Sequence, residues 1–368
     1  MYIERLYLVN FKNYNEVTVV LHNKVNCFIG DNGVGKTNLL DAVYYLCMCK
    51  SYFQSTDQYS IRQGEDFMTL QGSICNKEQT DEIHCVLKTG RKKQFRKNKK
   101  EYPTLSKHIG QYPVVMVSPA DSSLIAEGSE ERRKYINAVI SQYDSGYLED
   151  TIQYNHVLAQ RNRLLKEMRH HSDAEELISI FNEQLIPPGN RIFEHRKHFI
   201  KQLVPIFKEY YAQISQGKEN VDILYESQLN KNNFGELLKA GYQKDLSNQF
   251  TTVGIHKDDL DLQMQGVSIR KTGSQGQQKS FLVALKLAQF SFLKEIKGMP
   301  PFLLLDDIFD KFDSKRVKQI LHLVSDTTFG QIFITHTNEN RMQELLQEFH
   351  GNYNLYRVEN GQVTICNL

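Results

Sequence analysis

A glycine-rich loop between an apolar segment and a helical segment constrains this chain more than any other feature. Residues 30–37 are Gly-Asp-Asn-Gly-Val-Gly-Lys-Thr and match the pattern G-x-x-x-x-G-K-S/T at every required position. The apolar run 25–29 predicts a strand before the loop, and apolar spacing of three and four from Lys36 onward predicts a helix after it. Strand, loop and helix in this order are the context that the pattern needs. We therefore expect an α/β fold with a phosphate-binding loop.

The phosphate loop predicts a nucleotide site. Its glycines let backbone N–H groups turn towards phosphate oxygens, and the following helix adds the positive end of its dipole. Lys36 is expected to reach the β- and γ-phosphates, and the hydroxyl of Thr37 to hold Mg²⁺. The residues expected to bind the nucleotide are Gly30, Asp31, Asn32, Gly33, Val34, Gly35, Lys36 and Thr37.

Two adjacent carboxylates follow a second apolar run, 302–305. Asp306, at the end of a buried strand, can complete the Mg²⁺ shell beside Thr37. Asp307 is then placed to orient or deprotonate an attacking water. An ordinary strand-end turn would also explain the pair, but the phosphate loop in the same chain favours the functional interpretation.

A third segment, 274–279 (Ser-Gln-Gly-Gln-Gln-Lys), stands directly before a predicted helix over 277–296. Ser274 can cap this helix, whose first N–H groups can point at an anion. A capping turn accounts for the serine and the glycine but not for the three glutamines around them.

Composition and the distribution of hydrophobic residues limit the class of protein to which this chain can belong. With 368 residues the chain exceeds the usual length of one domain, and 40% hydrophobic and 24% charged residues are typical of a soluble globular protein. No run approaches the roughly 18 apolar residues of a membrane span, and the first residues lack a secretory pattern, so we expect no membrane and a cytoplasmic location. The six cysteines show no metal-ligand spacing, so free thiols are expected.

The order of predicted elements indicates α/β ends and a mainly helical middle. Short β-rich segments over 67–97 predict an antiparallel layer, and residues 130–215 have a helical pattern interrupted at the Pro-Pro-Gly of 187–189. Strands return near 261–269. The expected division is an N-terminal part of an ATPase lobe over 1–125, an inserted helical lobe over 126–250 and a C-terminal part of the ATPase lobe over 251–368.

The phosphate loop, the Ser-x-Gly-Gln segment and the carboxylate pair, in this order, resemble ATPases of the ATP-binding-cassette class. In that class the signature serine contacts the γ-phosphate of the nucleotide bound by a second copy. The resemblance implies a mixed sheet with a phosphate-loop helix, and a D-loop aspartate at Asp313. It makes Lys36, Asp307 and the switch histidine His336 catalytic, and adds to the nucleotide-binding residues Ser274, Gln275, Gly276 and Gln277.

Within that class the chain is similar to the RecF family of bacterial recombination-repair proteins. The similarity extends over nearly the whole chain and is strongest in the helical part. The matching segments are 11–14 (Phe-Lys-Asn-Tyr), 128–135 (Gly-Ser-Glu-Glu-Arg-Arg-Lys-Tyr), 154–165 (Tyr-Asn-His-Val-Leu-Ala-Gln-Arg-Asn-Arg-Leu-Leu), 254–260 (Gly-Ile-His-Lys-Asp-Asp-Leu) and 303–309 (Leu-Leu-Leu-Asp-Asp-Ile-Phe).

This resemblance implies an ATP-dependent DNA-binding homodimer of DNA repair, replication, recombination and the SOS response, with ATP and Mg²⁺ as cofactors. Its DNA would be duplex or gapped, with linear single strands as a further ligand, and it would help its partners RecO and RecR load RecA at single-strand gaps. Asp307 is one methylene shorter than the glutamate more common in the class, so we expect slow ATP hydrolysis. The alternatives are a head of an SMC-type machine or a transporter-type ATPase.

The positive charges offer two groups of candidate DNA contacts. The run 88–100 holds eight lysines and arginines and no acidic residue, and Arg132 and Arg133 follow in the helical part. A solvated loop face and a phosphate-backbone contact explain the run equally well from sequence alone. For residues 160–162, Gln-Arg-Asn, a helix face that packs within its own lobe and a direct partner or DNA contact are likewise both open.

Overall fold

A computed structural model describes residues 1–77, 79–167, 174–309, 314–325, 329–349 and 351–366. The chain divides into two compact units, and the mixed α/β fold agrees with expectation. Unit 1 comprises Met1–Ser122, Tyr210–Lys218 and Gln275–Leu368, and unit 2 comprises Ser123–Glu209 and Glu219–Ser274. The lobe boundaries expected at 125 and 250 stay a prediction. Unit 2 extends past 250 to Ser274 because the strand β10 (Asp259–Met264) pairs with β9 (Val221–Glu226) inside this unit.

The first sheet of unit 1 carries the phosphate loop. Its six strands stand in the order β15-β14-β3-β13-β12-β8, and every neighbouring pair is parallel except β14 with β15. Parallel strands end at one edge of a sheet, so the segments after β3, β8, β12 and β13 meet there. The strands are β3 (Val25–Ile29), β8 (Val114–Val117), β12 (Phe302–Asp306), β13 (Ile332–His336), β14 (Tyr353–Glu359) and β15 (Gln362–Ile365).

The second sheet of unit 1 is antiparallel throughout and has the order β2-β1-β4-β5-β6-β7. The antiparallel layer predicted over 67–97 is therefore present. Buried and exposed residues alternate along β2 and β5, the pattern of strands with one face in a core. The strands are β1 (Tyr2–Phe11), β2 (Tyr14–Val20), β4 (Phe67–Asn76), β5 (Gln79–Lys88), β6 (Gln94–Lys97) and β7 (Lys100–Glu101).

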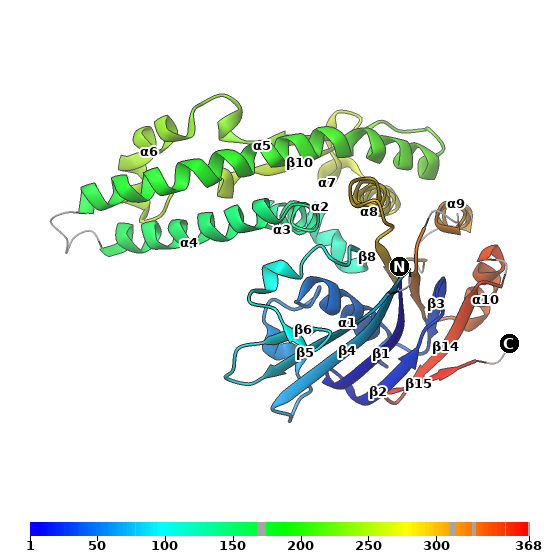
Figure 1. Cartoon of the computed structure of the whole chain (residues 1–368). Helices are drawn as coiled ribbons and strands as arrows, with labels where there is room; N and C mark the ends of the chain where they lie inside the picture. The colour runs from blue at the N-terminus through cyan, green and yellow to red at the C-terminus, as the bar shows by residue number, and fades with distance from the viewer. Residues whose placement is uncertain (78, 168–173, 310–313, 326–328, 350, 367–368) are drawn as a thin grey trace. The chain divides into compact units, whose positions relative to one another are not determined.

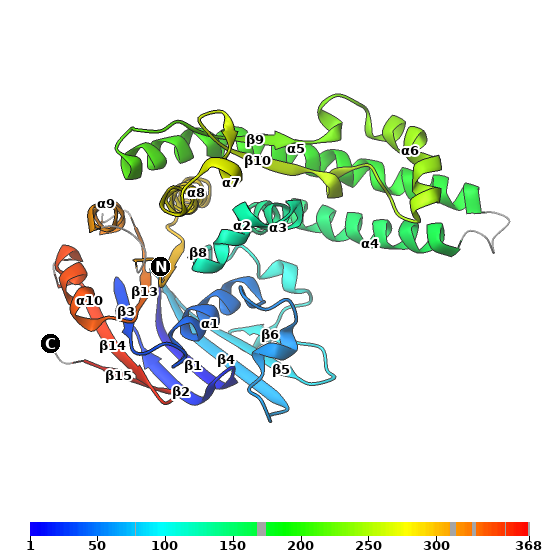
Figure 2. The same cartoon turned by 180° about the vertical axis from the view of Figure 1, so that it is seen from behind.

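The helix α1 (Lys36–Met48) follows the phosphate loop and contacts strands of both sheets of unit 1 (Figures 1 and 2). All its residues except Thr37 and Asn38 are buried. At Gly72 on β4 an added Cβ would lie 2.8 Å from Cδ1 of Leu46, so the sheet approaches the helix too closely for a side chain there. The other helices of the unit are α8 (Gln275–Lys297), α9 (Ser314–Ser325) and α10 (Glu339–Leu346).

Unit 2 is mainly helical, and α4 and the long helix α5 run side by side in both views (Figures 1 and 2). Leu164 and Leu165 of α4 form a buried cluster with Ile178 of α5. A small antiparallel sheet, β11-β10-β9, completes the unit. Its elements are α2 (Ser123–Ala126), α3 (Ser129–Ile140), α4 (Ser145–Glu167), α5 (Ala174–Ser215, whose last residues belong to unit 1), β9, α6 (Phe234–Asn248), β10, β11 (Val267–Ser268) and α7 (Ile269–Thr272).

The helix break expected at Pro187-Pro188-Gly189 is wrong. α5 continues through these residues and through Pro205. Gly189 is buried, and a Cβ added to it would lie 2.5 Å from Phe234 of α6 and 3.2 Å from Tyr154 of α4. At Gly189 the helix therefore packs closely against these two rings. Tertiary packing of this kind overrides the local tendency of proline and glycine to break a helix.

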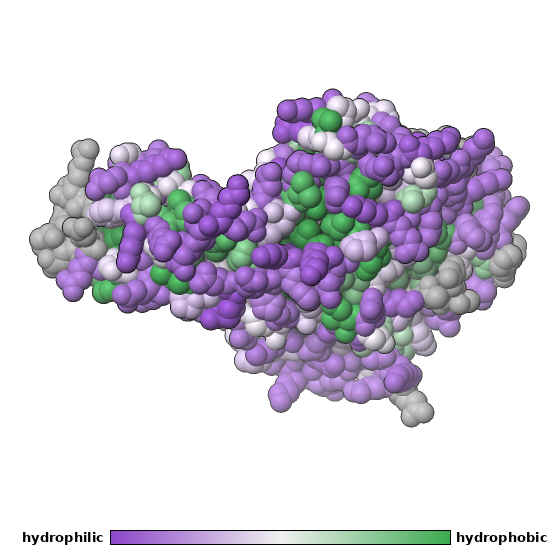
Figure 3. All heavy atoms as spheres, turned by 90° about the horizontal axis from the view of Figure 1, so that it is seen from above, coloured by the Kyte–Doolittle hydropathy of each residue, from purple (hydrophilic) through white to green (hydrophobic). Residues whose placement is uncertain are grey.

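No helix in the part of the chain that the structure describes is long and apolar enough to cross a membrane. The face drawn in Figure 3 is mostly hydrophilic, and some hydrophobic residues are visible on it.

Candidate nucleotide site

The phosphate loop follows β3 and depends on glycine at defined positions. Gly30, Gly33 and Gly35 have φ values of 150°, 82° and 114°, which side-chain-bearing residues rarely adopt. A Cβ on Gly30 would also lie 2.4 Å from the carbonyl oxygen of Val358 on β14. The loop is thus pressed against the neighbouring strand, and its conformation requires glycine.

The Phe-Lys-Asn-Tyr segment between β1 and β2 supports the loop from the other side. The amide of Asn13 donates to the carbonyl oxygen of Val34 (2.8 Å), and its oxygen accepts from Asn38 (2.7 Å). The hydroxyl of Tyr14 donates to the carbonyl oxygen of Gly35 (3.0 Å). These contacts explain how the segment can support a nucleotide site.

The ammonium of Lys36 lies over the loop. Its Nζ donates to the carbonyl oxygens of Gly30 and Asp31, both at 2.7 Å. Lys36 is 6% exposed, and its ammonium lies within hydrogen-bonding distance of the loop backbone. A phosphate group bound there would meet a cation that is already positioned.

Thr37 and Asp306 meet as the sequence predicts. The hydroxyl of Thr37 donates to Oδ1 of Asp306 at 2.8 Å, although the residues are 269 positions apart. Thr335 on β13 donates to the same oxygen at 2.9 Å. Burial raises the pKa of Asp306, and these hydroxyl donors counteract that effect. Hard oxygen donors of this kind are the ligands that Mg²⁺ prefers, so the two residues fit a magnesium site.

Asp307 directly follows β12 and His336 is the last residue of β13, so both lie at the same edge of the sheet. The backbone N–H of Asp307 donates to Oγ1 of Thr335 (2.9 Å), and its φ of 47° turns the chain away from the strand. The Nδ1 of His336 accepts from the N–H of Thr337 (2.8 Å), which leaves the proton of a neutral ring on Nε2. The predicted D-loop residue Asp313 lies outside the described residues.

The signature segment lies at the start of α8. Ser274 and Gln275 are exposed, and Gly276 is tightly packed, since an added Cβ would lie 3.0 Å from the guanidinium of Arg316 on α9. Arg316 also donates to Ser280, whose hydroxyl donates to the carbonyl oxygen of Gly276. Among the described residues, neither Thr37 nor Asp306 is hydrogen-bonded to this segment.

A polar cavity of about 330 Å³ borders the phosphate loop. Arg357 of β14 lines it and pairs with Glu339 of α10 at 2.6 Å. The cavity is lined by Ile29, Gly30, Asp31, Val34, Thr337, Glu339, Arg357, Glu359 and Asn360. It reaches from the first residues of the loop to the residue after His336, so it belongs to the same site.

The early loop after α1 has a structural role. The buried carboxylate of Asp41 accepts from Lys12 (2.7 Å), from the hydroxyl of Ser51 (2.7 Å) and from the N–H of Tyr52 (2.7 Å). The lysine in the Phe-Lys-Asn-Tyr segment thus neutralises a carboxylate of the phosphate-loop helix.

The basic run 88–100 splits into two kinds of residue. Lys93 is bonded to Asp57 (2.6 Å) and Lys97 to Asp81 (2.7 Å), and neither projects freely. Arg96 lies near Glu101 (3.9 Å). The remaining cations are exposed and pair with no carboxylate in the described ranges: Lys88, Arg91, Lys92, Lys99 and Lys100.

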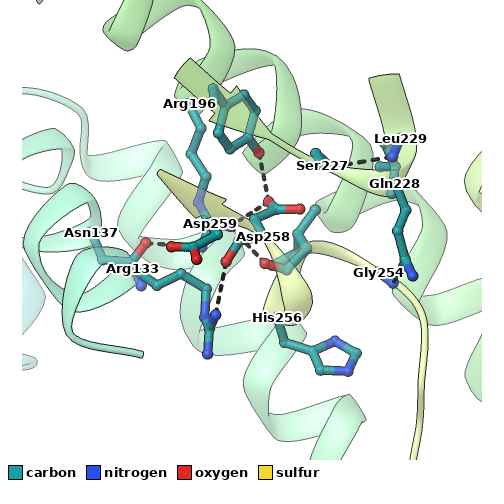
Figure 4. A network of polar contacts seen from close by, with 12 residues as sticks. Arg133, Asn137, Arg196, Ser227, Gln228, Leu229, Gly254, His256, Asp258 and Asp259 are labelled. Carbon is teal, nitrogen blue, oxygen red and sulfur yellow. Dashed lines mark hydrogen bonds and ion pairs between the residues drawn. The ribbon is translucent and has the colours of Figure 1, made fainter. Parts of the chain in front are cut away.

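The segment 254–260 forms the polar core of unit 2 (Figure 4). Arg196 of α5 is 2% exposed and pairs with Asp258 at 2.7 Å. Tyr225 donates to the same carboxylate at 2.5 Å, and Arg133 donates to the carbonyl oxygen of Asp258 at 2.8 Å. The ring of His256 is hydrogen-bonded on both sides, and burial lowers its pKa to about 4.

Most charged and polar residues of the helical motifs form ion pairs or hydrogen bonds within unit 2. Arg161 is fully buried and pairs with Asp245 at 2.8 Å, and Asn162 accepts from the N–H and hydroxyl of Thr251. Arg132 makes a two-pronged pair with Asp259 at 2.6 and 3.0 Å. For these residues the packing interpretation is the better one, whereas Gln160 is exposed.

Two residues of the site have no assigned role in the sequence interpretation. Thr335 bonds Asp306 from β13, and Ser118, after β8, donates to the other oxygen of Asp306 at 3.5 Å. Both residues lie at the ends of strands that neighbour β12. In the sequence, their place after or within a short apolar run indicates only that they lie near the end of a strand. The order of strands in the sheet is needed to show that they are adjacent to Asp306.

Comparison with known proteins agrees with this geometry. Residues 1–185 match the AAA ATPase domain family. The chain is 48% identical over 364 residues to the DNA replication and repair protein RecF of Bacteroides thetaiotaomicron, covering 99% of this chain and 98% of that protein. It is 45% identical over 359 residues to RecF of Flavobacterium johnsoniae, covering 97% and 100%.

Solved structures give the same result. A structure of the recombination mediator protein RecF with ATP, described as part of the RecFOR pathway, has a TM-score of 0.89 and 29% identity and covers 100% of this chain and 98% of that one. An Smc head bound to the C-terminal winged-helix domain of ScpA has a TM-score of 0.57 and 15% identity over 100% and 98% of the chains. The latter similarity shows the fold alone.

Proposed function

Because the chain belongs to the RecF family of DNA replication and repair proteins, we propose that it binds DNA as an ATP-closed homodimer in recombinational repair. The observation that carries this proposal is the contact of Thr37 with Asp306 at 2.8 Å beside a complete phosphate loop. Structures of relatives are named for RecF with ATP and for the RecFOR pathway. We therefore propose ATP as the nucleotide, RecO and RecR as partners, RecA loading at single-strand gaps as the outcome, and a cytoplasmic location.

ATP binding would use groups that are already in place. Lys36 would exchange the carbonyl oxygens of Gly30 and Asp31 for the β- and γ-phosphates. Thr37 and Asp306 would hold Mg²⁺, which when bound neutralises phosphate charge. Asn13 and Tyr14 would keep the loop in its binding conformation through Val34 and Gly35.

Hydrolysis would be carried out by Asp307 and His336. Asp307 follows β12 and His336 ends β13, and the ends of these strands meet next to the phosphate loop. Asp307 would orient or deprotonate the attacking water, and the Nε2–H of His336 would donate to the γ-phosphate. Hydrolysis then acts as a timer that reopens the dimer.

Ser274 and Gln275 are exposed at the start of α8, as residues that act on a second copy must be. Helix N-termini attract anions through their N–H groups and dipole. We place Ser274, Gln275, Gly276 and Gln277 against the nucleotide of the second copy, so that ATP joins the two chains.

The DNA surface would include the exposed cations around β6 and β7. Lys88, Arg91, Lys92, Lys99 and Lys100 are available for phosphates because no carboxylate among the described residues pairs with them. Arg132 and Arg133 are less suitable, since both donate within unit 2. Contacts to phosphates would make binding independent of sequence and sensitive to salt.

Binding to a gapped duplex, measured by fluorescence anisotropy with and without ATP, tests the proposal. The Asp307→Asn variant should bind ATP without hydrolysing it, and we expect its affinity for the gapped duplex to rise at least tenfold with ATP. The matched control is Asp307→Asn combined with Lys36→Ala, which removes phosphate binding and should abolish the gain. Equal binding with and without ATP would refute an ATP-switched DNA clamp.

A further inference from the structure

Ser118 lies beside the carboxylate that we assign to the magnesium site. It follows β8, which is parallel to β12 with Val117 opposite Leu305. Its hydroxyl donates to Oδ2 of Asp306 at 3.5 Å, while Oδ1 accepts from Thr37 and Thr335. Ser118 is 6% and Asp306 4% exposed. The two oxygens of this carboxylate therefore contact different elements, Oδ1 with α1 and β13 and Oδ2 with the residue after β8.

Asp121 fixes the position of Ser118. One oxygen of its carboxylate, Oδ2, accepts from the backbone N–H of Ser118 at 2.8 Å. In return the N–H of Asp121 donates to the carbonyl oxygen of Ser118 at 3.0 Å. Two hydrogen bonds between Ser118 and Asp121 thus fix the turn after β8, so Ser118 has little freedom to move away from Asp306.

The other oxygen of Asp121 is tied to the signature helix. It pairs with Nζ of Lys286 on α8 at 2.7 Å, and the two side chains are 3% and 4% exposed. The hydroxyl of Tyr52 donates to Asp121 and accepts from Lys286 at 2.9 Å. Separating two buried charges costs free energy, because each is then left without its counter-charge. A shift of α8 at Lys286 would therefore displace Asp121 and with it Ser118.

We propose that Ser118 is a positioning residue for the divalent cation of this site, and that the Asp121–Lys286 pair sets its place from α8. This inference rests on the proposed function. Groups that hydrogen-bond a metal-binding carboxylate orient it, and their loss typically lowers metal affinity about 10–100-fold. Mg²⁺ also retains several waters, for which the Ser118 hydroxyl is a ready partner. The helix that begins with the signature residues is thereby coupled to cation affinity.

Electron paramagnetic resonance of Mn²⁺ tests this with the full chain in an Asp307→Asn background. Bound and free Mn²⁺ are titrated in the presence of ATP, and nucleotide binding is measured separately in EDTA. Adding Ser118→Ala should raise the Mn²⁺ concentration at half-saturation about tenfold and leave ATP binding in EDTA unchanged. Ser73→Ala, at a buried serine of β4, is the matched control and should change neither quantity.

Variants of Lys286 test the coupling to α8. Lys286→Met should weaken Mn²⁺ binding in the same direction as Ser118→Ala, and Lys286→Arg, which keeps the charge, should restore most of it. If Lys286→Met does not fold, the pair of changes Asp121→Asn and Lys286→Met removes both charges and should still weaken Mn²⁺ binding.

The outcomes separate this inference from the proposed function. Mn²⁺ half-saturation of Ser118→Ala equal to that of its parent would overturn the role of Ser118. A Lys286→Met or double variant with unchanged Mn²⁺ affinity would overturn the coupling. If the Asp307→Asn parent shows no Mn²⁺-dependent ATP binding, the proposed nucleotide site itself is wrong, and the inference falls with it.

Discussion

Arg161 and Arg163 stand two positions apart on α4 and illustrate how burial decides what a charge contributes. Arg161 is fully buried against Asp245, whereas Arg163 pairs with Glu167 at the surface with 78% of its side chain exposed. We expect Arg161→Met to lower the free energy of unfolding by about 3–5 kcal/mol, since Asp245 is left uncompensated. Arg163→Met should cost less than about 1 kcal/mol. Urea unfolding of both variants measures the difference, and equal losses would contradict this account.

His256 makes stability depend on pH. Burial lowers its pKa to about 4 from an ordinary value of 6.5, so between these values the unfolded chain binds more protons than the folded one. Stability is therefore lost as pH falls from 6.5 towards 4, by about 1.4 kcal/mol per pH unit from this residue. His256→Gln should show a smaller drop in unfolding free energy between pH 7 and pH 5 than the parent. His156→Gln, at an exposed position of α4, should retain the parent's drop.

The role of a residue could be predicted where one short segment contains both the reactive side chain and the strand or helix that positions it. Lys36, Thr37 and Asp306 are of this kind, and the meeting of Thr37 with Asp306 is confirmed. Ser118 could not be assigned, because its role depends on β8 lying next to β12, far away in sequence. Lys93 and Lys97 look like their neighbours in the basic run, but each has a carboxylate partner more than 15 positions away.

Among the elements, α5 depends on packing at Gly189. Alanine in place of glycine usually stabilises a helix interior by roughly 0.5–1 kcal/mol. Gly189→Ala should instead destabilise unit 2 by about 1–3 kcal/mol, because its Cβ would lie 2.5 Å from Phe234. Gly146→Ala, on α4 with only Asp144 nearby at 3.3 Å, is the control and should be neutral or stabilising. Thermal unfolding of both variants measures the change in stability, and stabilisation by Gly189→Ala would refute the packing argument.

Elements with a strong period were predicted within a few residues, and those set by tertiary contacts were not. The expected helix over 277–296 corresponds to α8, and the strand expected at 302–305 to β12. α5 continues through its prolines, and at Gly189 it lies against Tyr154 of α4 and Phe234 of α6. β9 pairs with β10 across 33 or more positions, and its pattern of buried residues covers only its first half. Such pairing is not visible in a local window of sequence.

For the whole molecule, ATP turnover should be slow. Asp307 has a shorter side chain than glutamate, and its backbone is held in a left-handed conformation at φ 47°. We expect kcat below about 10 s⁻¹, the median for enzymes. A coupled assay of ATP hydrolysis in the presence of gapped DNA gives the value. Faster turnover would argue against a timer.

DNA affinity of the whole molecule should fall steeply with salt. Replacing Lys99 and Lys100 by alanine should reduce the slope of log affinity against log salt by about 0.9 for each phosphate that the protein no longer neutralises. Lys239→Ala with Lys244→Ala, at exposed positions of α6, is the matched control and should leave the slope unchanged. An unaltered slope in the first variant would place the DNA surface elsewhere.

The central claim is that ATP joins two copies of this chain through the phosphate loop of one and Ser274 of the other. Mass photometry of Asp307→Asn with and without ATP and Mg²⁺ tests it most directly. The account predicts the 42.8 kDa mass of one chain without ATP and twice that mass with ATP. It also predicts that Ser274→Arg remains at the mass of one chain while still binding ATP. A mass that does not respond to ATP would contradict the account.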